Sequence, residues 1–129
     1  MRFLSIYKTV ERNTPPTQEE METMGQLIQE YMASGHLIAT EGCLPSALGA
    51  RIRREGGRVT VTDGPFSESK EVVGGFALLE AESKEEAIAL TRRFLEVAGE
   101  GECELRQLYQ GEGGDCVGEL SAEAEPAHA

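Results

Sequence analysis

Short apolar segments typical of β-strands alternate along the chain with longer segments that carry a helical apolar stripe. Six segments have the strand pattern: residues 2–8, 36–44, 47–54, 58–62, 72–80 and 102–109. In the first, Phe3, Ser5 and Tyr7 share one face while Leu4 and Ile6 share the other, so both faces carry apolar groups. We therefore expect this strand to be covered on both sides.

Two segments have the spacing of amphipathic helices, and each begins with a capping box. Thr17 and Glu20 open the first helix, and Ser83 and Glu86 open the second. The apolar stripes are Met21, Met24, Leu27, Ile28, Tyr31 and Met32 in the first helix and Ala87, Leu90, Thr91, Phe94, Leu95 and Ala98 in the second. Glycines at positions 35 and 99 are expected to end the helices.

Glycines interrupt one helix and one strand. Gly25 lies inside the first helix, where glycine costs ~1 kcal/mol relative to alanine, and close packing is the only reason that the sequence offers. Gly74 and Gly75 lie inside the apolar strand 72–80. Such a pair predicts a bulge, or the close approach of another backbone or a ligand.

The order of these segments is β-α-β-β-β-α-β, with residues 55–57 as a hairpin loop. We predict an α+β, ferredoxin-like fold over residues 1–110, in which an antiparallel sheet has two helices on one face. The other sheet face would then be exposed in a single copy. We therefore expect a homodimer that pairs through its sheet faces.

Charge and composition narrow the function classes. The chain has 129 residues and a formal net charge of −11, which disfavours nucleic acid as a partner because its binding needs a basic face. No apolar run approaches the ~20 residues of a membrane span, so we expect a cytoplasmic protein without membrane contact. Residues 111–129 hold five acidic and no basic side chains and are expected to form a flexible acidic tail.

Residues 61–76, the signature segment, hold the densest chemistry. Asp63-Gly64-Pro65 cannot continue a strand, because proline lacks the N–H and glycine favours turn dihedrals. The segment resembles the signature of the DGPF branch of the YciI-related (YCII) family, which has Asp-Gly-Pro-Phe, then Glu-x-Lys-Glu, then Gly-Gly-Phe. The resemblance extends over residues 2–110 and implies a dimeric α+β barrel with a pocket at the signature.

This resemblance and the residue types suggest a catalytic site. Asp63 is the candidate general acid or base, Glu68 or Glu71 would tune it, and Lys70 would neutralise an anionic substrate. The expected binding residues are Arg51, Arg53, Phe66, Glu71 and Gly74, with Phe66 buried as the anchor of the loop. The other interpretation gives Asp63 to a turn, pairs Lys70 with a neighbouring glutamate, and leaves the arginines as solvated partners of carboxylates.

The histidines and cysteines give weaker indications of a functional site. Some YciI-related proteins pair a histidine early in the first helix with an aspartate, but here His36 follows that helix and His128 lies in the tail, so this dyad cannot be transferred. A histidine beside a helix end is more often structural. Cys43, Cys103 and Cys116 lack the spacing of a disulfide framework or a zinc site, so we expect no metal.

Two functions remain open. In the first, the protein binds or transforms a small, anionic organic molecule without a cofactor, in a pocket at the signature. In the second, it is a non-enzymatic regulatory or interaction module, because DGPF proteins resemble companions of alternative sigma factors.

Overall fold

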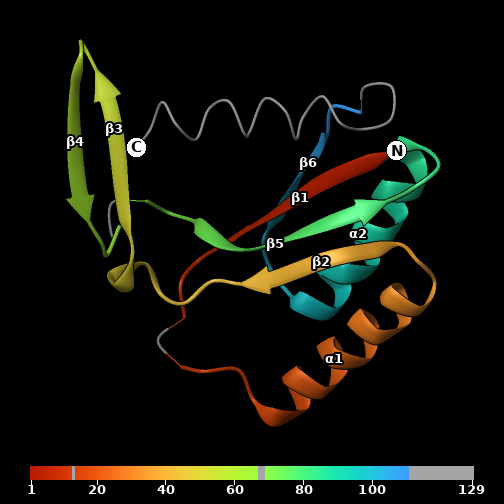
Figure 1. Ribbon diagram of the computed structural model, residues 1–129. Helices are drawn as coiled ribbons and strands as arrows, with labels where there is room; N and C mark the ends of the chain where they lie inside the picture. The colour runs from red at the N-terminus through yellow and green to blue at the C-terminus, as the bar shows by residue number, and fades with distance from the viewer. Residues whose placement is uncertain (13, 67–68, 111–129) are drawn as a thin grey trace.

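The computed structural model describes residues 1–12, 14–66 and 69–110. The predicted tail, residues 111–129, therefore lies outside the described residues. The elements are β1 (Arg2–Thr9), α1 (Gln18–Ala33), β2 (Leu37–Gly42), the 3₁₀ turn η1 (Ser46–Leu48), β3 (Ala50–Glu55), β4 (Arg58–Asp63), β5 (Val72–Glu80), α2 (Lys84–Ala98) and β6 (Glu102–Gln107) (Figure 1).

Four strands form one antiparallel sheet in the order β2-β5-β1-β6. Both helices lie on one side of this sheet (Figure 1). The core between the layers consists of Phe3, Leu27, Tyr31, Leu37, Leu79, Ala81 and Ala87. This arrangement confirms the predicted ferredoxin-like α+β fold.

Capping hydrogen bonds fix the start of each helix. At α1 the Thr17 hydroxyl accepts from the Glu20 amide while the Glu20 carboxylate accepts from the Thr17 amide, as predicted. At α2 the Ser83 hydroxyl accepts from the Glu86 amide, but the Glu86 carboxylate accepts from the amide of Glu82. The second predicted capping box is thus formed in part, with its return bond shifted by one residue.

Some predicted strand boundaries are wrong. The strand expected at residue 47 begins at Ala50, because Ser46–Leu48 form a 3₁₀ turn after Pro45. The strand expected at His36 begins at Leu37, since the His36 amide donates to the carbonyl of Tyr31 and closes the end of α1. The last strand ends at Gln107 and not at residue 109.

Strands β3 and β4 form a separate two-stranded sheet, which we name the arm (residues 50–63). Its predicted loop contains Gly56 and Gly57, both at positive φ (57° and 80°), as a tight hairpin turn requires. Every residue of both strands is exposed. Figure 1 shows the arm standing apart from the four-stranded sheet and far from both helices.

The sheet face that points away from the helices carries an apolar strip, and we name it the open face. Because Phe3 packs into the core, strand alternation places Leu4 and Ile6 on the opposite side. On β5, Leu78 pairs with Leu4 and Phe76 pairs with Ile6. Phe76 is 40 % exposed and the other three are half-buried. The second face is therefore apolar, as predicted, but only Phe76 of these four residues is exposed.

Candidate functional site

A cavity of about 490 Å³ lies between the two helices and the sheet. Most of its lining is apolar and comes from α1, α2 and the helix-facing side of β1, β2 and β5. Principal apolar lining residues are Met21, Met24, Leu27, Ile28, Leu90, Phe94 and Val97. Mainly apolar walls with few polar groups, at this volume, are typical of sites for small organic molecules. The predicted apolar stripe of α1 thus has two roles, because Met24 and Ile28 pack against the core and also line the cavity.

Gly25 borders this cavity from the middle of α1. A Cβ atom built at Gly25 would have nothing within 4 Å, so close packing, the reason expected from the sequence, is wrong. The missing side chain leaves space open instead. The helix therefore carries a destabilising residue at a position where any larger side chain would narrow the cavity.

Gly74 and Gly75 are two of the β5 residues that line the cavity. Tyr7 pairs with Gly75 and Lys8 with Val73, so Gly74 is the extra residue of a β-bulge. A Cβ on Gly75 would lie 2.8 Å from the carbonyl oxygen of Glu41 on β2, and one on Gly74 would lie 3.3 Å from the Tyr7 ring. The bulge and the close backbone approach predicted for this glycine pair are confirmed.

Two tyrosines contribute oriented polar groups to the cavity lining. The Tyr7 hydroxyl donates to the carbonyl of Glu100 (2.9 Å), and the Tyr31 hydroxyl donates to the carbonyl of Leu90 (2.9 Å). Burial raises the pKa of Tyr31, so this phenol stays protonated. The Tyr7 ring meets Phe94 edge to face, with centroids 5.4 Å apart. With their protons engaged, both oxygens can only accept hydrogen bonds from a ligand.

An ion pair lies at the exposed edge of the cavity. The Arg12 guanidinium binds both carboxylate oxygens of Glu20, at 3.0 and 3.3 Å, and both residues line the cavity. Arg12 and the amide of Thr17 lower the pKa of Glu20 to about 2. Arg12 thus places a positive charge in bidentate geometry where a ligand would enter. The sequence carries no signal for Arg12, because this residue lies in a polar loop outside any motif.

The signature residues lie at the arm and its base. Asp63 ends β4 and is exposed, pairing in register with Ala50. At the base, the Gly64 amide donates to the carbonyl of Gly49, and the Phe66 amide donates to the hydroxyl of Ser46. A Cβ on Gly64 would collide with the Ser46 carbonyl. The turn of the signature therefore packs closely against the backbone of η1.

A second set of contacts ties this base to the body. The Ser46 hydroxyl and amide donate to the Glu11 carboxylate at 2.5 and 2.6 Å, which lowers the pKa of Glu11. The Arg51 guanidinium lies 3.9 Å from the centroid of the Phe66 ring and donates to the hydroxyl of Ser69. Phe66 is half-buried, so the burial predicted for it as the anchor of the loop is met only in part, although Arg51 covers one side of its ring.

The other predicted site residues are spread over different surfaces. Lys70 and Glu71 are exposed, and Arg53 approaches Glu55 at 3.5 Å on the arm. Arg51 and Arg53 share one face of the arm, whereas Asp63 lies on the other by strand alternation. Glu68 lies outside the described residues. Of the predicted set, Gly74 lines the 490 Å³ cavity, and neither Asp63 nor Lys70 does.

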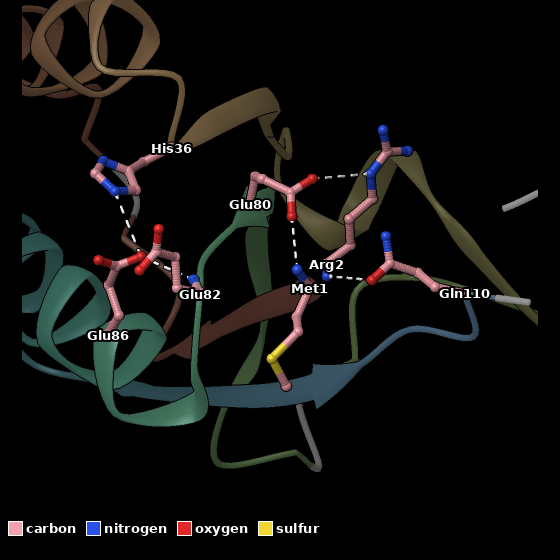
Figure 2. A network of polar contacts seen from close by, with 7 residues as sticks. All are labelled: Met1, Arg2, His36, Glu80, Glu82, Glu86 and Gln110. Atoms are coloured by element: carbon pink, nitrogen blue, oxygen red, sulfur yellow. Dashed lines mark hydrogen bonds and ion pairs between the residues drawn. The ribbon is translucent and has the colours of Figure 1, made fainter. Parts of the chain in front are cut away.

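His36 lies in a smaller cavity of about 290 Å³ between the end of α1 and the start of α2. Its Nδ1 lies 2.8 Å from the Ser34 hydroxyl, and its Nε2 lies 3.5 Å from Glu86. Figure 2 shows Glu86 between His36 and the amide of Glu82, beside the network in which Glu80 binds the Met1 amine and Arg2. The Ser34 hydroxyl also donates to the carbonyl of Tyr31 at 3.1 Å, and Ser34 is the C-cap residue of α1. This geometry supports the structural interpretation of His36.

The part of the chain that the structure describes contains neither a candidate metal site nor a candidate membrane-spanning helix. Its His, Cys, Asp and Glu side chains form no group of three that could hold a metal ion. Cys43 is exposed, and burial raises the pKa of the half-buried Cys103. Within the same ranges, neither helix is both long and apolar enough to cross a membrane.

Comparison with known proteins identifies the family. The chain is 32 % identical over 72 residues to the uncharacterized protein R00369 of Rhizobium meliloti (strain 1021), a match that covers 56 % of this chain and 58 % of the relative. A solved structure of 5-chloro-2-hydroxyhydroquinone dehydrochlorinase (TftG) from Burkholderia phenoliruptrix AC1100 superposes with a TM-score of 0.48 at 17 % identity, covering 89 % of this chain and all of that one. The model of the YCII-related domain matches residues 1–110. The chain therefore belongs to the YCII-related family.

Proposed function

We propose that the protein binds a small, mainly apolar organic molecule with one anionic group in the cavity between its helices and its sheet. The observation that carries this proposal is the cavity of about 490 Å³, whose apolar lining is left open at Gly25. A helix that gives up ~1 kcal/mol to keep this space is best explained by an occupant. The tyrosine oxygens then accept hydrogen bonds from donor groups on the ligand.

The anionic group follows from Arg12. A guanidinium held in bidentate geometry suits a carboxylate, and Arg12 already binds Glu20 in this way at the edge of the cavity. The acidic group of a ligand would compete with Glu20 for Arg12 while its apolar body lay inside. The ligand that we propose is therefore still anionic, as the sequence predicted, but Arg12 binds its anionic group instead of Arg51 and Arg53.

The narrower family assignment rests on the signature. Asp63 to Phe66, then Glu68, Lys70 and Glu71, match the DGPF pattern, and we assign the chain to this branch of the YCII-related family. Catalytic roles for Asp63, Glu68 and Lys70 stay predictions, as does a cytoplasmic location. We place ligand binding in the helix-sheet cavity because Asp63 and Lys70 do not line it.

A second copy of the chain is the partner that we propose for the open face. Its apolar strip of Leu4, Ile6, Phe76 and Leu78 is the kind of surface that a homodimer buries. This dimer does not enter the ligand proposal, since the cavity lies on the opposite side of the sheet.

A thermal-shift panel tests the ligand proposal. The panel contains aromatic and aliphatic carboxylic acids, phenols and the matching neutral esters, because a ligand that binds the native state raises the melting temperature by mass action. We expect an acid to raise the melting temperature by several degrees and its ester to have a weaker effect. Gly25→Leu should abolish the shift by filling the cavity.

Gln26→Leu is the matched control, because it adds the same side chain one position along on the exposed side of α1 and should keep the shift. An acid that shifts Gly25→Leu as much as the wild type would overturn the proposal. If Asp63→Asn removes binding while Gly25→Leu retains it, the site is at the signature. A panel without any shift favours the regulatory module associated with alternative sigma factors, which needs no ligand.

A further inference from the structure

Five of the side chains that line the helix-sheet cavity carry a hydroxyl group, and they differ in where their protons go. Tyr7, Tyr31, Thr40 and Thr91 each donate to a backbone carbonyl, at 2.8 or 2.9 Å. With their protons engaged, these four oxygens can only accept a hydrogen bond from a ligand. The fifth hydroxyl belongs to Ser5, which also lines the cavity.

Ser5 is buried on the helix-facing side of β1, with 6 % of its surface exposed. Among the residues that the structure describes, no carbonyl or carboxylate accepts its proton. The thiol of Cys103 lies beside the Ser5 hydroxyl, and burial raises the pKa of this thiol. A protonated thiol is a weak acceptor, so the Ser5 proton stays available to a ligand. A buried donor without a strong acceptor calls for an explanation.

The neighbours of Ser5 leave room for a ligand atom. Ser5 pairs with Ala77 on β5, and in the next row of the same face Tyr7 pairs with Gly75. Ala77 and Gly75 line the cavity as well. Ser5 lies in the middle of β1, whereas Arg12 follows the end of that strand. The available donor and the guanidinium are therefore suited to two different groups on one ligand.

We propose that the ligand of this cavity is an oxo-carboxylic acid, with its carboxylate at Arg12 and a carbonyl oxygen that accepts the Ser5 proton. The inference rests on the proposed function and narrows its ligand class. A ligand hydroxyl at Ser5 would bring a proton of its own, for which Ala77 and Gly75 have no side-chain acceptor. A carbonyl oxygen brings none, so it suits this part of the cavity better.

Pairs of acids that differ only by a ketone provide the first test. Benzoylpropionic and benzoylbutyric acid are the keto acids, and phenylbutyric and phenylvaleric acid are their deoxo partners, with a methylene group in place of the carbonyl. A site that donates a hydrogen bond rejects an analogue that leaves its donor unpaired. By isothermal titration calorimetry, we expect at least one keto acid to bind the wild type about tenfold more tightly than its partner.

Ser5→Ala removes the donor with little change in volume. It should weaken binding of the keto acid about tenfold and change the affinity of the deoxo partner less than about twofold. Thr91→Val is the matched control, because Thr91 is 7 % exposed, lines the same cavity and donates its proton to the Ala87 carbonyl. This variant should keep the preference for the keto acid. Matching far-UV circular dichroism spectra confirm that both variants are folded.

Infrared spectroscopy of a keto acid labelled with an isotope at the ketone carbon detects the hydrogen bond itself. A donated proton lowers the stretching frequency of a carbonyl. The bound acid should therefore absorb at a lower frequency in the wild type than in Ser5→Ala, and Thr91→Val should match the wild type. A Ser5 that only supports the fold would leave this frequency unchanged.

The inference and the proposed function fail in different ways. If keto and deoxo acids bind the wild type equally and Gly25→Leu abolishes both, the cavity binds acids but the oxo class is wrong. Equal weakening of both acids by Ser5→Ala, or an equal loss of the preference in Thr91→Val, overturns the role of Ser5. If neither keto nor deoxo acids bind the wild type, the proposed function fails and this inference fails with it.

Discussion

The helix-covered body and the arm belong to one chain, yet they are stabilised in different ways. In the body, Phe3, Leu27 and Ala87 are 2, 4 and 0 % exposed, whereas Ile52 and Val61 of the arm are 68 and 65 % exposed. The body thus folds around its own core. The arm is held by its hairpin ladder and its base, and its apolar residues are exposed. An apolar pattern therefore identifies a strand without saying what will cover it.

The largest expected contrast is between truncations in the two regions. Leu27→Ala removes a core side chain between α1 and the sheet and should lower the free energy of unfolding by ~2–5 kcal/mol. Val59→Ala in the arm should change it by less than about 0.5 kcal/mol in the monomer. Urea denaturation of the two variants beside the wild type measures both changes. A large loss for Val59→Ala would show that this side chain is covered in solution.

A smaller effect is expected where the arm joins the body. Gly64→Ala should cost ~1–3 kcal/mol, because the new Cβ collides with the Ser46 carbonyl and the turn must move. Gly49→Ala on the other side of the same contact is the control, since its Cβ would lie 3.6 Å from Ser46, an ordinary distance. Limited proteolysis across residues 44–71 should accelerate in Gly64→Ala alone. Equal cleavage of the two variants would contradict a rigid base.

The sequence predicted the body far better than the arm or the cavity, for a physical reason. Thr17, Ser83 and the apolar stripes act within one or two helical turns, so local spacing reveals them. The cavity arises where α1, α2 and β5 meet, and its main marker, Gly25, looked like a packing residue because spacing carries no information about empty space. Arg12 lies in a loop whose position depends on the whole fold.

The signature also shows that local spacing does not determine which side chains meet in the fold. Its spacing suggested convergence of Asp63, Lys70 and Arg51, since a loop of that length can fold back on itself. Strand register instead puts Asp63 and Arg51 on opposite faces of the arm. The turn and the glycine bulge were predictable because each depends on backbone geometry alone.

Two glycines of α1 allow a further test of how the body is stabilised. Gly25→Ala should stabilise the protein by ~1 kcal/mol, because alanine gains helix propensity and its Cβ meets nothing within 4 Å. Gly35→Ala, at the end of the same helix, should destabilise it, since Gly35 has a φ of 80° that alanine adopts at a cost. Thermal unfolding should therefore show a raised melting temperature for Gly25→Ala and a lowered one for Gly35→Ala. A destabilised Gly25→Ala would mean that the space beside α1 is filled in solution.

The smallest effect concerns the ion pair at the edge of the cavity. Arg12 and the Thr17 amide lower the pKa of Glu20 from 4.5 to about 2, so this carboxylate binds fewer protons in the folded state than in the unfolded state. Its contribution to stability is therefore present above pH 4.5 and is lost as the pH falls from 4.5 to about 2. Because both side chains are about half exposed, salt should weaken the contribution. An NMR titration of the Glu20 carboxyl carbon should find the low pKa in the wild type and a higher one in Arg12→Gln, while the Thr17 amide keeps part of the shift. An unchanged Glu20 pKa in Arg12→Gln would mean that the guanidinium is free in solution, and it would then be available to a ligand without competition.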